Sequence, residues 1–328
     1  MNLLEVRGLT KHFTQRGGLL RPAAPPVRAV DGVNLSIDAG RTLGLVGESG
    51  CGKSTLGRAI LRLIEPTAGS VMLDGAPVTG ISGAELYRRR REMQIIFQDP
   101  YASLNPRRTV LETLREPLDL HRVGDASDRR ARIEELIEIV GLRRQVLGRY
   151  PHEFSGGQRQ RIGIARALCL NPKFIVADEA VSALDVSVQA QVLNLIFDLQ
   201  ERFGIAFLFI SHDLAVVQHI SHQVAVMYLG QVVETSTTDQ LFAAPRHPYT
   251  RALMSAVPVP DPTRKSNRIL LPGDVPSATA PPPGCPFHTR CPEATATCRE
   301  RVPPRTNQGS ADAPHWVNCH LYPEDAKA

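Results

Sequence analysis

The sequence predicts an α/β fold built around a parallel β-sheet. Four short apolar runs end abruptly in glycine or in polar residues, which is typical of buried parallel strands, and helical stretches separate them. With 328 residues, of which 42% are hydrophobic, the chain is long enough for one large or two ordinary globular domains. The four runs are TLGLVG (42–47), QIIFQ (94–98), FIVADE (174–179) and AFLFISH (206–212).

Composition divides the chain into a long core and a short tail. Residues 1–255 hold the four apolar runs, and a mainly helical insertion is expected at about 99–160, where ARIEELIEIVGL (131–142) has helical periodicity and ends at glycine. Residues 256–283 are dense in proline, which predicts a linker. We expect residues 284–328 to form a small, loop-rich module.

Charge and hydropathy limit the functional classes. The net charge of +5 would suit nucleic acid or an anionic membrane, but it is spread over mixed-sign segments. Only RRRR (88–91) stands out, and it favours a solvated helix face. No apolar run approaches the roughly 18 residues that span a bilayer, and MNLLEVRGL at the N-terminus carries an acid where a signal peptide is apolar. We therefore expect a soluble, cytoplasmic protein without a nucleic-acid partner.

A glycine-rich loop follows the first apolar run. GESGCGKS (47–54) matches G-x-x-x-x-G-K-[ST] and leads into a helical stretch, the context that this phosphate-binding motif requires. Backbone N–H groups and the helix start would surround phosphate oxygens. Lys53 would reach the β- and γ-phosphates, and the Ser54 hydroxyl would ligate Mg²⁺. A glycine turn without chemistry is the alternative. The predicted nucleotide-binding loop comprises Gly47, Glu48, Ser49, Gly50, Cys51, Gly52, Lys53, Ser54 and Thr55.

Polar residues end the other three runs. Gln98, Asp178 with Glu179, and His212 follow them, and the carboxyl ends of parallel strands share one edge of a sheet. Asp178 would hold the Mg²⁺ shell, and Glu179 would polarise the attacking water. His212 would contact the γ-phosphate or orient the water. A solvent-facing acidic pair and a structural histidine are the alternatives.

A second helix start has the features of an anion site. In FSGGQRQRIGIARAL (154–168), Ser155 and Gln158 fit the capping box S-x-x-Q. Gly156 and Gly157 remove side chains from the first turn, so its N–H groups are open to an anion. A tightly packed helix start is the alternative. The chain thus carries two predicted phosphate-binding helix starts.

Five motifs, in order and spacing, resemble the ATP-binding subunit of ABC transporters over about residues 1–255. The resemblance implies a P-loop NTPase core that hydrolyses ATP and uses Mg²⁺ as its cofactor. It also implies that two ATP molecules are held between two subunits. The family's signature loop, which corresponds to FSGGQRQR here, would face the glycine loop of the other subunit. The motifs are GESGCGKST, IIFQD, FSGGQRQR, IVADEAVSALD and FISHDL.

The same resemblance assigns further roles. It implies that Gln98 links Mg²⁺ and the attacking water to the membrane subunits, and that Asp185 belongs to the loop that crosses the dimer interface. Phe13 would stack on adenine, with a core or edge phenylalanine as the alternative. Two positions depart from the family pattern, namely Phe154 in place of leucine and Ala180 in place of proline. Neither departure removes a phosphate ligand or a catalytic group.

A finer resemblance concerns the transported substrate. QDPYASLNPR, DVSVQAQVLNLI and RHPYTRALMSAVP (246–258) resemble the oligopeptide/dipeptide branch of ABC importers, which also includes nickel, opine and glutathione systems. It implies a subunit at the cytoplasmic face of the membrane that energises peptide import. Its partners would be a second, heteromeric ATPase subunit, two permease subunits and an extracytoplasmic substrate-binding protein.

Two other classes of ATPase contain a similar ATP-binding domain, which is called the head. Chromosome-associated and DNA-repair ATPases usually interrupt it with a long coiled coil or zinc insertions, and the interval here is about a hundred residues without extended heptads. Translation-associated members carry two heads, whereas this chain carries one.

Four cysteines crowd the C-terminal segment. In a reducing cytosol such a group points to metal before disulfides. The spacing C-x5-C-x6-C-x20-C is unlike the paired C-x2-C of zinc ribbons, whereas a [4Fe–4S] cluster needs no fixed short spacing. GCPFHTRCP with two later cysteines resembles the C-terminal segment of peptide-importer ATPases that carry such a cluster. Zn²⁺ and unligated thiols are the alternatives to this expected metal staple, whose ligands would be Cys285, Cys291, Cys298 and Cys319.

Overall fold

The computed structural model describes residues 2–14, 25–257 and 268–323, and it divides into two compact units. The first unit is formed by residues 1–4, 37–42 and 74–210, and the second unit by residues 5–36, 43–73 and 211–328.

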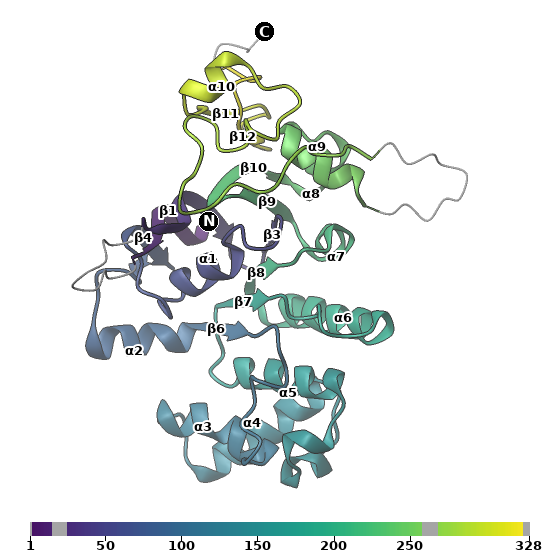
Figure 1. Ribbon diagram of the computed structural model, residues 1–328. Coiled ribbons are helices and arrows are strands. Elements are labelled where there is room, and N and C mark those ends of the chain that lie inside the picture. The colour runs from purple at the N-terminus through teal and green to yellow at the C-terminus, as the bar shows by residue number, and fades with distance from the viewer. Residues whose placement is uncertain (1, 15–24, 258–267, 324–328) are drawn as a thin grey trace, which may run out of the picture. The chain divides into compact units, whose positions relative to one another are not determined.

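The first unit contains a parallel sheet in the order β8-β7-β6 (Figure 1). Every residue of β7 and β8 is buried, as expected for strands covered on both faces. Three of the four predicted strands are therefore confirmed in this unit, and the fourth is confirmed as Thr42–Val46, which is described with the second unit. The elements are β5 (Ala76–Pro77), α2 (Gly83–Glu92), β6 (Met93–Ile96), β7 (Phe174–Asp178), α6 (Val186–Phe203) and β8 (Ala206–Ile210). Helix α2 carries the arginine run and has no buried residue, which confirms the solvated helix face.

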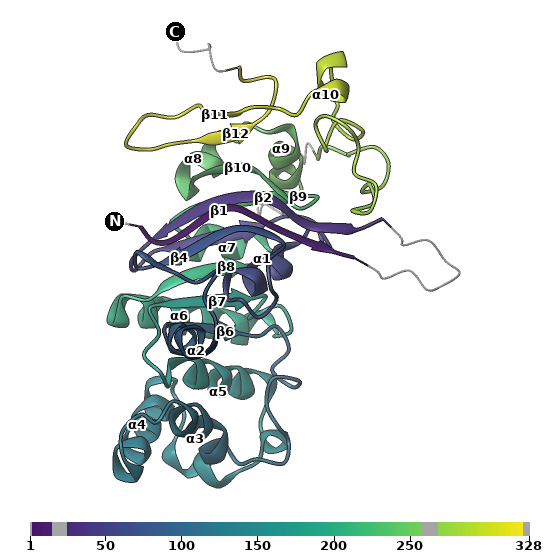
Figure 2. The same ribbon diagram turned by 90° about the vertical axis from the view of Figure 1, so that its left-hand side faces the viewer.

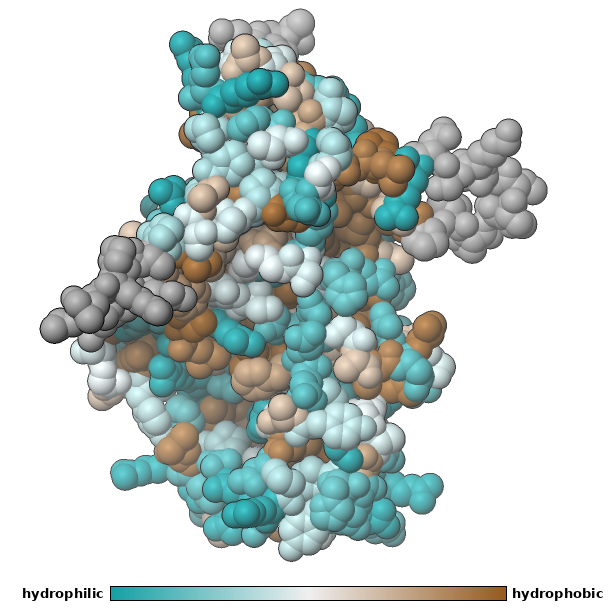
Figure 3. Space-filling model, in the orientation of Figure 1, coloured by the Kyte–Doolittle hydropathy of each residue, from teal (hydrophilic) through white to brown (hydrophobic). Residues whose placement is uncertain are grey.

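Residues 110–168, in the middle of the sequence of the first unit, form a group of helices. Capping boxes begin α3, between Thr109 and Glu112, and α4, between Asp125 and Asp128. The apolar faces of α3 and α4 are buried around Leu114 and Leu136, whereas the outer surface over these helices is mainly hydrophilic (Figure 3). The group consists of α3 (Val110–Leu120), α4 (Ala126–Ile139), the short 3₁₀ turns η1 (Arg144–Gly148) and η2 (Pro151–Glu153), and α5 (Gly156–Leu168).

The second unit contains two sheets. One has the order β2-β1-β4, with its long strands side by side in Figure 2, and the other has the order β11-β12-β10-β9-β3. β3 pairs with β9 in parallel, and the remaining pairs of the second sheet are antiparallel. The strands are β1 (Asn2–Phe13), β2 (Val27–Asp38), β3 (Thr42–Val46), β4 (Ala68–Leu73), β9 (Gln223–Tyr228), β10 (Gln231–Thr237), β11 (Arg305–Asn307) and β12 (Trp316–Asn318). The helices are α1 (Lys53–Ile60), α7 (Leu214–Ile220), α8 (Thr238–Ala243), α9 (Pro248–Ser255) and α10 (Ala296–Glu300).

The C-terminal segment joins the sheet of the second unit. β12 pairs antiparallel with β10, with Thr235 opposite Trp316, and β11 pairs with β12. The segment therefore adds two strands to one end of the sheet, of which β11 is the edge strand, whereas the sequence predicted a loop-rich module there. None of the helices within the described ranges combines the length and the apolar character that a membrane crossing needs.

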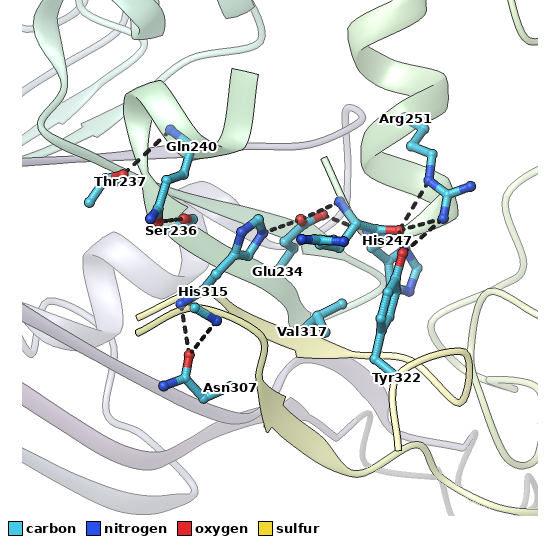
Figure 4. Close-up of polar contacts among 12 residues, drawn as sticks. Glu234, Ser236, Thr237, Gln240, His247, Arg251, Asn307, His315, Val317 and Tyr322 are labelled. Carbon is cyan, nitrogen blue, oxygen red and sulfur yellow. Dashed lines mark hydrogen bonds and ion pairs between the residues drawn. The ribbon is translucent and has the colours of Figure 1, made fainter. Parts of the chain in front are cut away.

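A buried carboxylate fixes this junction (Figure 4). Glu234 of β10 accepts hydrogen bonds from the backbone N–H groups of Arg246 (2.7 Å) and His247 (2.9 Å), just before α9. The ring of His315, which precedes β12, donates to the same carboxylate from Nε2 at 2.6 Å. Burial raises the pKa of Glu234, but these hydrogen bonds outweigh it, so the pKa lies below its usual value. One ionised side chain thus holds a strand, a helix start and the C-terminal segment together.

His247 makes the stability of this junction dependent on pH. Burial lowers its pKa to about 4, so the folded protein keeps the ring neutral where the unfolded chain, with a pKa of about 6.5, takes up a proton. The stability that the neutral His247 ring contributes is complete above pH 6.5 and is lost as the pH falls toward 4. His247 also accepts the Tyr249 N–H through Nδ1, and asparagine keeps such an acceptor without titrating.

The variant His247→Asn isolates this effect. Between pH 7.5 and pH 5, the free energy of unfolding of the wild type should fall by about 2 kcal/mol more than that of His247→Asn. Urea unfolding of both proteins at both pH values measures the difference, and Glu234 is common to both. Equal losses would contradict the assignment.

Candidate nucleotide-binding site

The second unit holds the glycine-rich loop between β3 and α1. Gly47 and Gly52 have φ of +152° and +107°, a region that residues with a side chain rarely adopt. A Cβ at Gly47 would lie 2.1 Å from the carbonyl oxygen of Met227, and one at Gly52 would lie 2.0 Å from that of Ala29. Neighbouring backbone therefore excludes any larger residue at both positions, and the loop has the close curvature that phosphate-binding loops need.

Lys53 lies at the start of α1 and faces this loop. It is buried, with 5% of its surface exposed, and its Nζ donates to the carbonyl oxygens of Gly47 (2.8 Å) and Glu48 (3.0 Å). Gly52 caps the helix without a side chain, so no capping side chain takes the first N–H groups of α1. An ammonium group and open helix N–H groups at one helix start are suited to bind phosphate. Ser54 and Thr55 follow in the first turn, and burial raises the pKa of the Cys51 thiol.

The predicted acidic pair, Asp178 and Glu179, lies at the end of β7 in the first unit. Asp178 is the last residue of β7 and is 2% exposed. Glu179 follows with φ of +47°, an uncommon conformation for a residue with a side chain, and its N–H donates to the Ile210 carbonyl at 3.0 Å. Such strain is concentrated at functional sites. Nε2 of Gln98 donates to Oε2 of Glu179 at 2.8 Å, so the structure brings together two of the residues predicted to meet at the sheet edge.

The signature helix α5 also lies in the first unit. Ser155 Oγ accepts the N–H of Gln158 at 3.4 Å, and Gln158 Oε1 accepts the N–H of Ser155 at 3.1 Å, so the capping box is confirmed. Gly157 is packed tightly, because a Cβ there would lie 2.3 Å from Cγ1 of Val188. Gly156 is more open, since its nearest neighbour would be an ordinary contact at 3.5 Å. The helix start is therefore tightly packed at Gly157, whereas its surface is open at Gly156.

Three predicted residues lie on the surface of their units. Phe13, at the end of β1 in the second unit, is 40% exposed, and the Lys11 ammonium lies 5.0 Å from its ring centroid, so it is not a core residue. His212, also in the second unit, is exposed and precedes α7. Asp185 in the first unit is the N-cap of α6, and the N–H of Val188 lowers the pKa of its carboxyl group. The two departures from the family pattern, Phe154 and Ala180, are buried.

The four C-terminal cysteines lie near one another but do not form a metal site. Cys285, Cys298 and Cys319 are buried and Cys291 is half-buried. Burial, with smaller contributions from the other thiols, raises the pKa of Cys285 to about 11 and that of Cys319 to about 12. Within the described ranges, no three histidine, cysteine, aspartate or glutamate side chains are arranged to hold a metal ion.

The expected metal-stapled module is therefore not supported. β12 and the hydrogen bond from His315 to Glu234 hold the segment instead.

Sequence reasoning did not identify two residues that contact the glycine-rich loop. Tyr249 of α9 and Arg290 of the C-terminal segment both bind Glu48. They stand 201 and 242 residues from it in the chain, and no local pattern signals such contacts.

Known proteins resemble this chain along almost its whole length. Residues 30–182 match the family model of the ABC transporter, and residues 233–298 match that of the oligopeptide/dipeptide transporter C-terminal region. The chain is 53% identical to a probable peptide ABC transporter ATP-binding protein of Sinorhizobium fredii, over 97% of this chain and 90% of that protein. It is 52% identical to the oligopeptide transport ATP-binding protein AppF of Bacillus subtilis, over 98% of this chain and 97% of that protein.

A solved structure shares the fold. A dimeric ATP-binding cassette in a post-hydrolysis state, bound to ADP and Pi, superimposes with a TM-score of 0.63. It is 30% identical to this chain and covers 72% of it, and 98% of the cassette is matched.

Proposed function

Because this chain belongs to the ATP-binding subunits of peptide ABC transporters, we propose that it hydrolyses ATP to energise the import of di- and oligopeptides through membrane-spanning permease subunits. The observation that carries the ATPase assignment is the glycine-rich loop with Lys53 folded onto its carbonyl oxygens. The peptide assignment depends on the match of residues 233–298 and on the names of the relatives. The chain works at the cytoplasmic face of the membrane, where permeases of this family receive their ATPase subunits.

Each part of the site has a distinct task. The N–H groups of the loop and Lys53 bind the phosphates and offset their charge. Glu179 accepts a proton from the attacking water, and Gln98 orients that carboxylate through its Nε2. His212 contacts the γ-phosphate, and Phe13 stacks on the adenine ring.

Three residues, taken one by one, carry the hard oxygen atoms that Mg²⁺ favours. Ser54 offers a hydroxyl, Asp178 a buried carboxylate, and Gln98 its amide oxygen, because Nε2 is the atom that donates to Glu179. Mg²⁺ held by these residues would supply positive charge that offsets the negative charge developing on the phosphates during hydrolysis.

Uptake of a labelled dipeptide tests the transport assignment. Membrane vesicles that contain this chain with its permease, partner ATPase and substrate-binding subunits should accumulate the peptide only when ATP is present. Unlabelled tri- and tetrapeptides should compete, whereas Ni²⁺, opines and glutathione should not. Competition by one of these latter compounds and not by peptides would assign the transporter to a sister branch of the family.

We propose that the signature helix start completes an ATP site on a partner subunit, and that this partner is a second, heteromeric ATPase chain. Ser155 at the open end of α5 would bind the γ-phosphate held by the partner's glycine-rich loop, and Asp185 would lie at the interface. The dimeric arrangement of the solved cassette supports a paired state.

Replacing Ser155 tests this role. Ser155→Ala should leave ATP binding by the isolated chain unchanged but should lower hydrolysis by the assembled transporter about 10- to 100-fold, because one donor to the developing charge is lost. Thr109→Ala is the matched control, since it removes the capping box of α3. Phosphate release measures both variants, and equal effects would reduce Ser155 to a helix cap.

A [4Fe–4S] cluster on the four cysteines, or Zn²⁺ in its place, stays a prediction from the resemblance of GCPFHTRCP. To bind either metal, the thiols would have to lose their protons and rearrange. Iron and zinc analysis of the full chain, purified without oxygen, decides the matter. Four iron atoms per chain with visible absorbance would establish the cluster, and metal-free protein would leave the thiols unligated.

A further inference from the structure

A salt bridge connects the glycine-rich loop with the C-terminal segment. Nη1 of Arg290 donates to Oε2 of Glu48 at 2.8 Å, and Nη2 donates to Oε1 at 3.2 Å. This two-pronged geometry is the strongest that arginine forms with a carboxylate. The Arg290 side chain is 9% exposed and that of Glu48 is 27% exposed, so water and salt screen the pair only partly.

The backbone of Glu48 is held from the same side. Its N–H donates to the hydroxyl of Tyr249 in α9 at 2.8 Å, and Tyr249 is fully buried. Chain beyond residue 245 therefore fixes both the main chain and the side chain of the second loop residue. The Glu48 carbonyl in turn accepts from Nζ of Lys53, so the position of Glu48 bears on the phosphate-binding lysine.

Aromatic packing sets the position of Arg290. Phe287 is 1% exposed, and its ring centroid lies 5.2 Å from that of Tyr228, 5.4 Å from that of Tyr249 and 5.5 Å from that of His247. The N–H of Arg290 donates to the Phe287 carbonyl at 3.0 Å, which closes a turn between the two residues. The guanidinium is thus presented to Glu48 from a rigid base.

Because Glu48 is negatively charged, its salt bridge with Arg290 affects nucleotide binding. A carboxylate within a phosphate-binding loop repels an anionic ligand, and the repulsion is large where water is largely excluded. Arg290 offsets this charge and fixes its location. Without Arg290, the loop would keep a partly buried, unpaired negative charge beside the phosphates.

We propose that Arg290 is a positioning residue of the nucleotide site, through which the C-terminal segment sets the affinity for ATP. The proposal rests on the proposed function, since it presumes that the loop binds ATP.

Equilibrium titration of the full chain with a fluorescent ATP analogue and Mg²⁺ tests the proposal. Arg290→Ala should raise the Kd about tenfold, which corresponds to about 1.4 kcal/mol. Arg290→Lys keeps the charge but loses the two-pronged geometry, so it should raise the Kd only about threefold. Adding Glu48→Gln to Arg290→Ala should restore most of the lost affinity, because the unpaired charge is then removed. A purely structural role of Arg290 predicts no such rescue.

Arg251→Ala is the matched control. Arg251 pairs with Glu293 at 2.9 Å and with the hydroxyl of Tyr322, so it binds the same segment without contacting the loop. Its replacement should leave the Kd unchanged. Wild-type affinity in Arg290→Ala, equal weakening in Arg251→Ala, or failure of the rescue would each overturn the inference. A wild-type chain that does not bind the analogue would instead refute the proposed ATPase function.

Discussion

Glu179→Gln is expected to bind ATP with normal affinity and to lose about 10²- to 10⁴-fold of its hydrolysis rate, the usual contribution of a general base. Glutamine has the same shape and still accepts the hydrogen bond from Nε2 of Gln98, but it cannot take a proton from water. The strained backbone at φ of +47° is unaffected, because both side chains branch beyond Cβ. With the chemical step blocked, ATP should hold two subunits together. Phosphate release by the assembled transporter measures the rate, and size-exclusion chromatography of the variant with its partner ATPase subunit and ATP measures the dimer.

Glu201→Gln provides the control for this variant. Glu201 is an exposed glutamate of α6, so its replacement changes the net charge equally but should leave turnover and dimerisation as in the wild type. Normal steady-state turnover by Glu179→Gln would show that Glu179 is not the general base, and His212 would then be the next candidate.

The parts of the fold that follow local rules could be predicted from the sequence. The apolar runs at 174–179 and 206–212 identify buried strands, because a short run with an abrupt polar end has few other interpretations. The meeting of Gln98 with Glu179 follows from the rule that parallel strands deliver their carboxyl ends to one edge. The capping box of Ser155 and Gln158 likewise depends only on residues three apart.

The C-terminal segment could not be predicted in the same way. β11 and β12 have three residues each and lie in proline-rich sequence, so they carry too little alternation to identify a strand. They form because β10 offers an unpaired edge and because Glu234 is paired with His315, 81 residues away. The cysteines were visible in the sequence, but their spacing does not determine how their sulfur atoms lie in space. For the same reason the contact of Arg290 with Glu48 has no sequence signal.

Lys53→Ala is expected to weaken nucleotide binding by roughly 100-fold or more, because one charge-assisted contact to the phosphates and the only side-chain cation of the loop motif are lost together. The Nζ of Lys53 is already within 3.0 Å of two loop carbonyls, so the ammonium is positioned before the ligand arrives and little rotamer entropy is spent on binding. Titration with the fluorescent ATP analogue measures the affinity. Thermal unfolding shows whether the variant keeps its fold.

Lys173→Ala separates this effect from the general loss of a lysine. Lys173 is paired with Asp74 near the surface of the first unit, and both side chains are about half exposed. Surface pairs of this kind contribute about 0–1 kcal/mol to stability, so Lys173→Ala should bind the analogue as the wild type does. The contrast depends on burial, because a charge shielded from water acts on a phosphate far more strongly than one in solvent. Unchanged affinity in Lys53→Ala would therefore exclude the glycine-rich loop as the phosphate site, whatever the rest of the motif suggests.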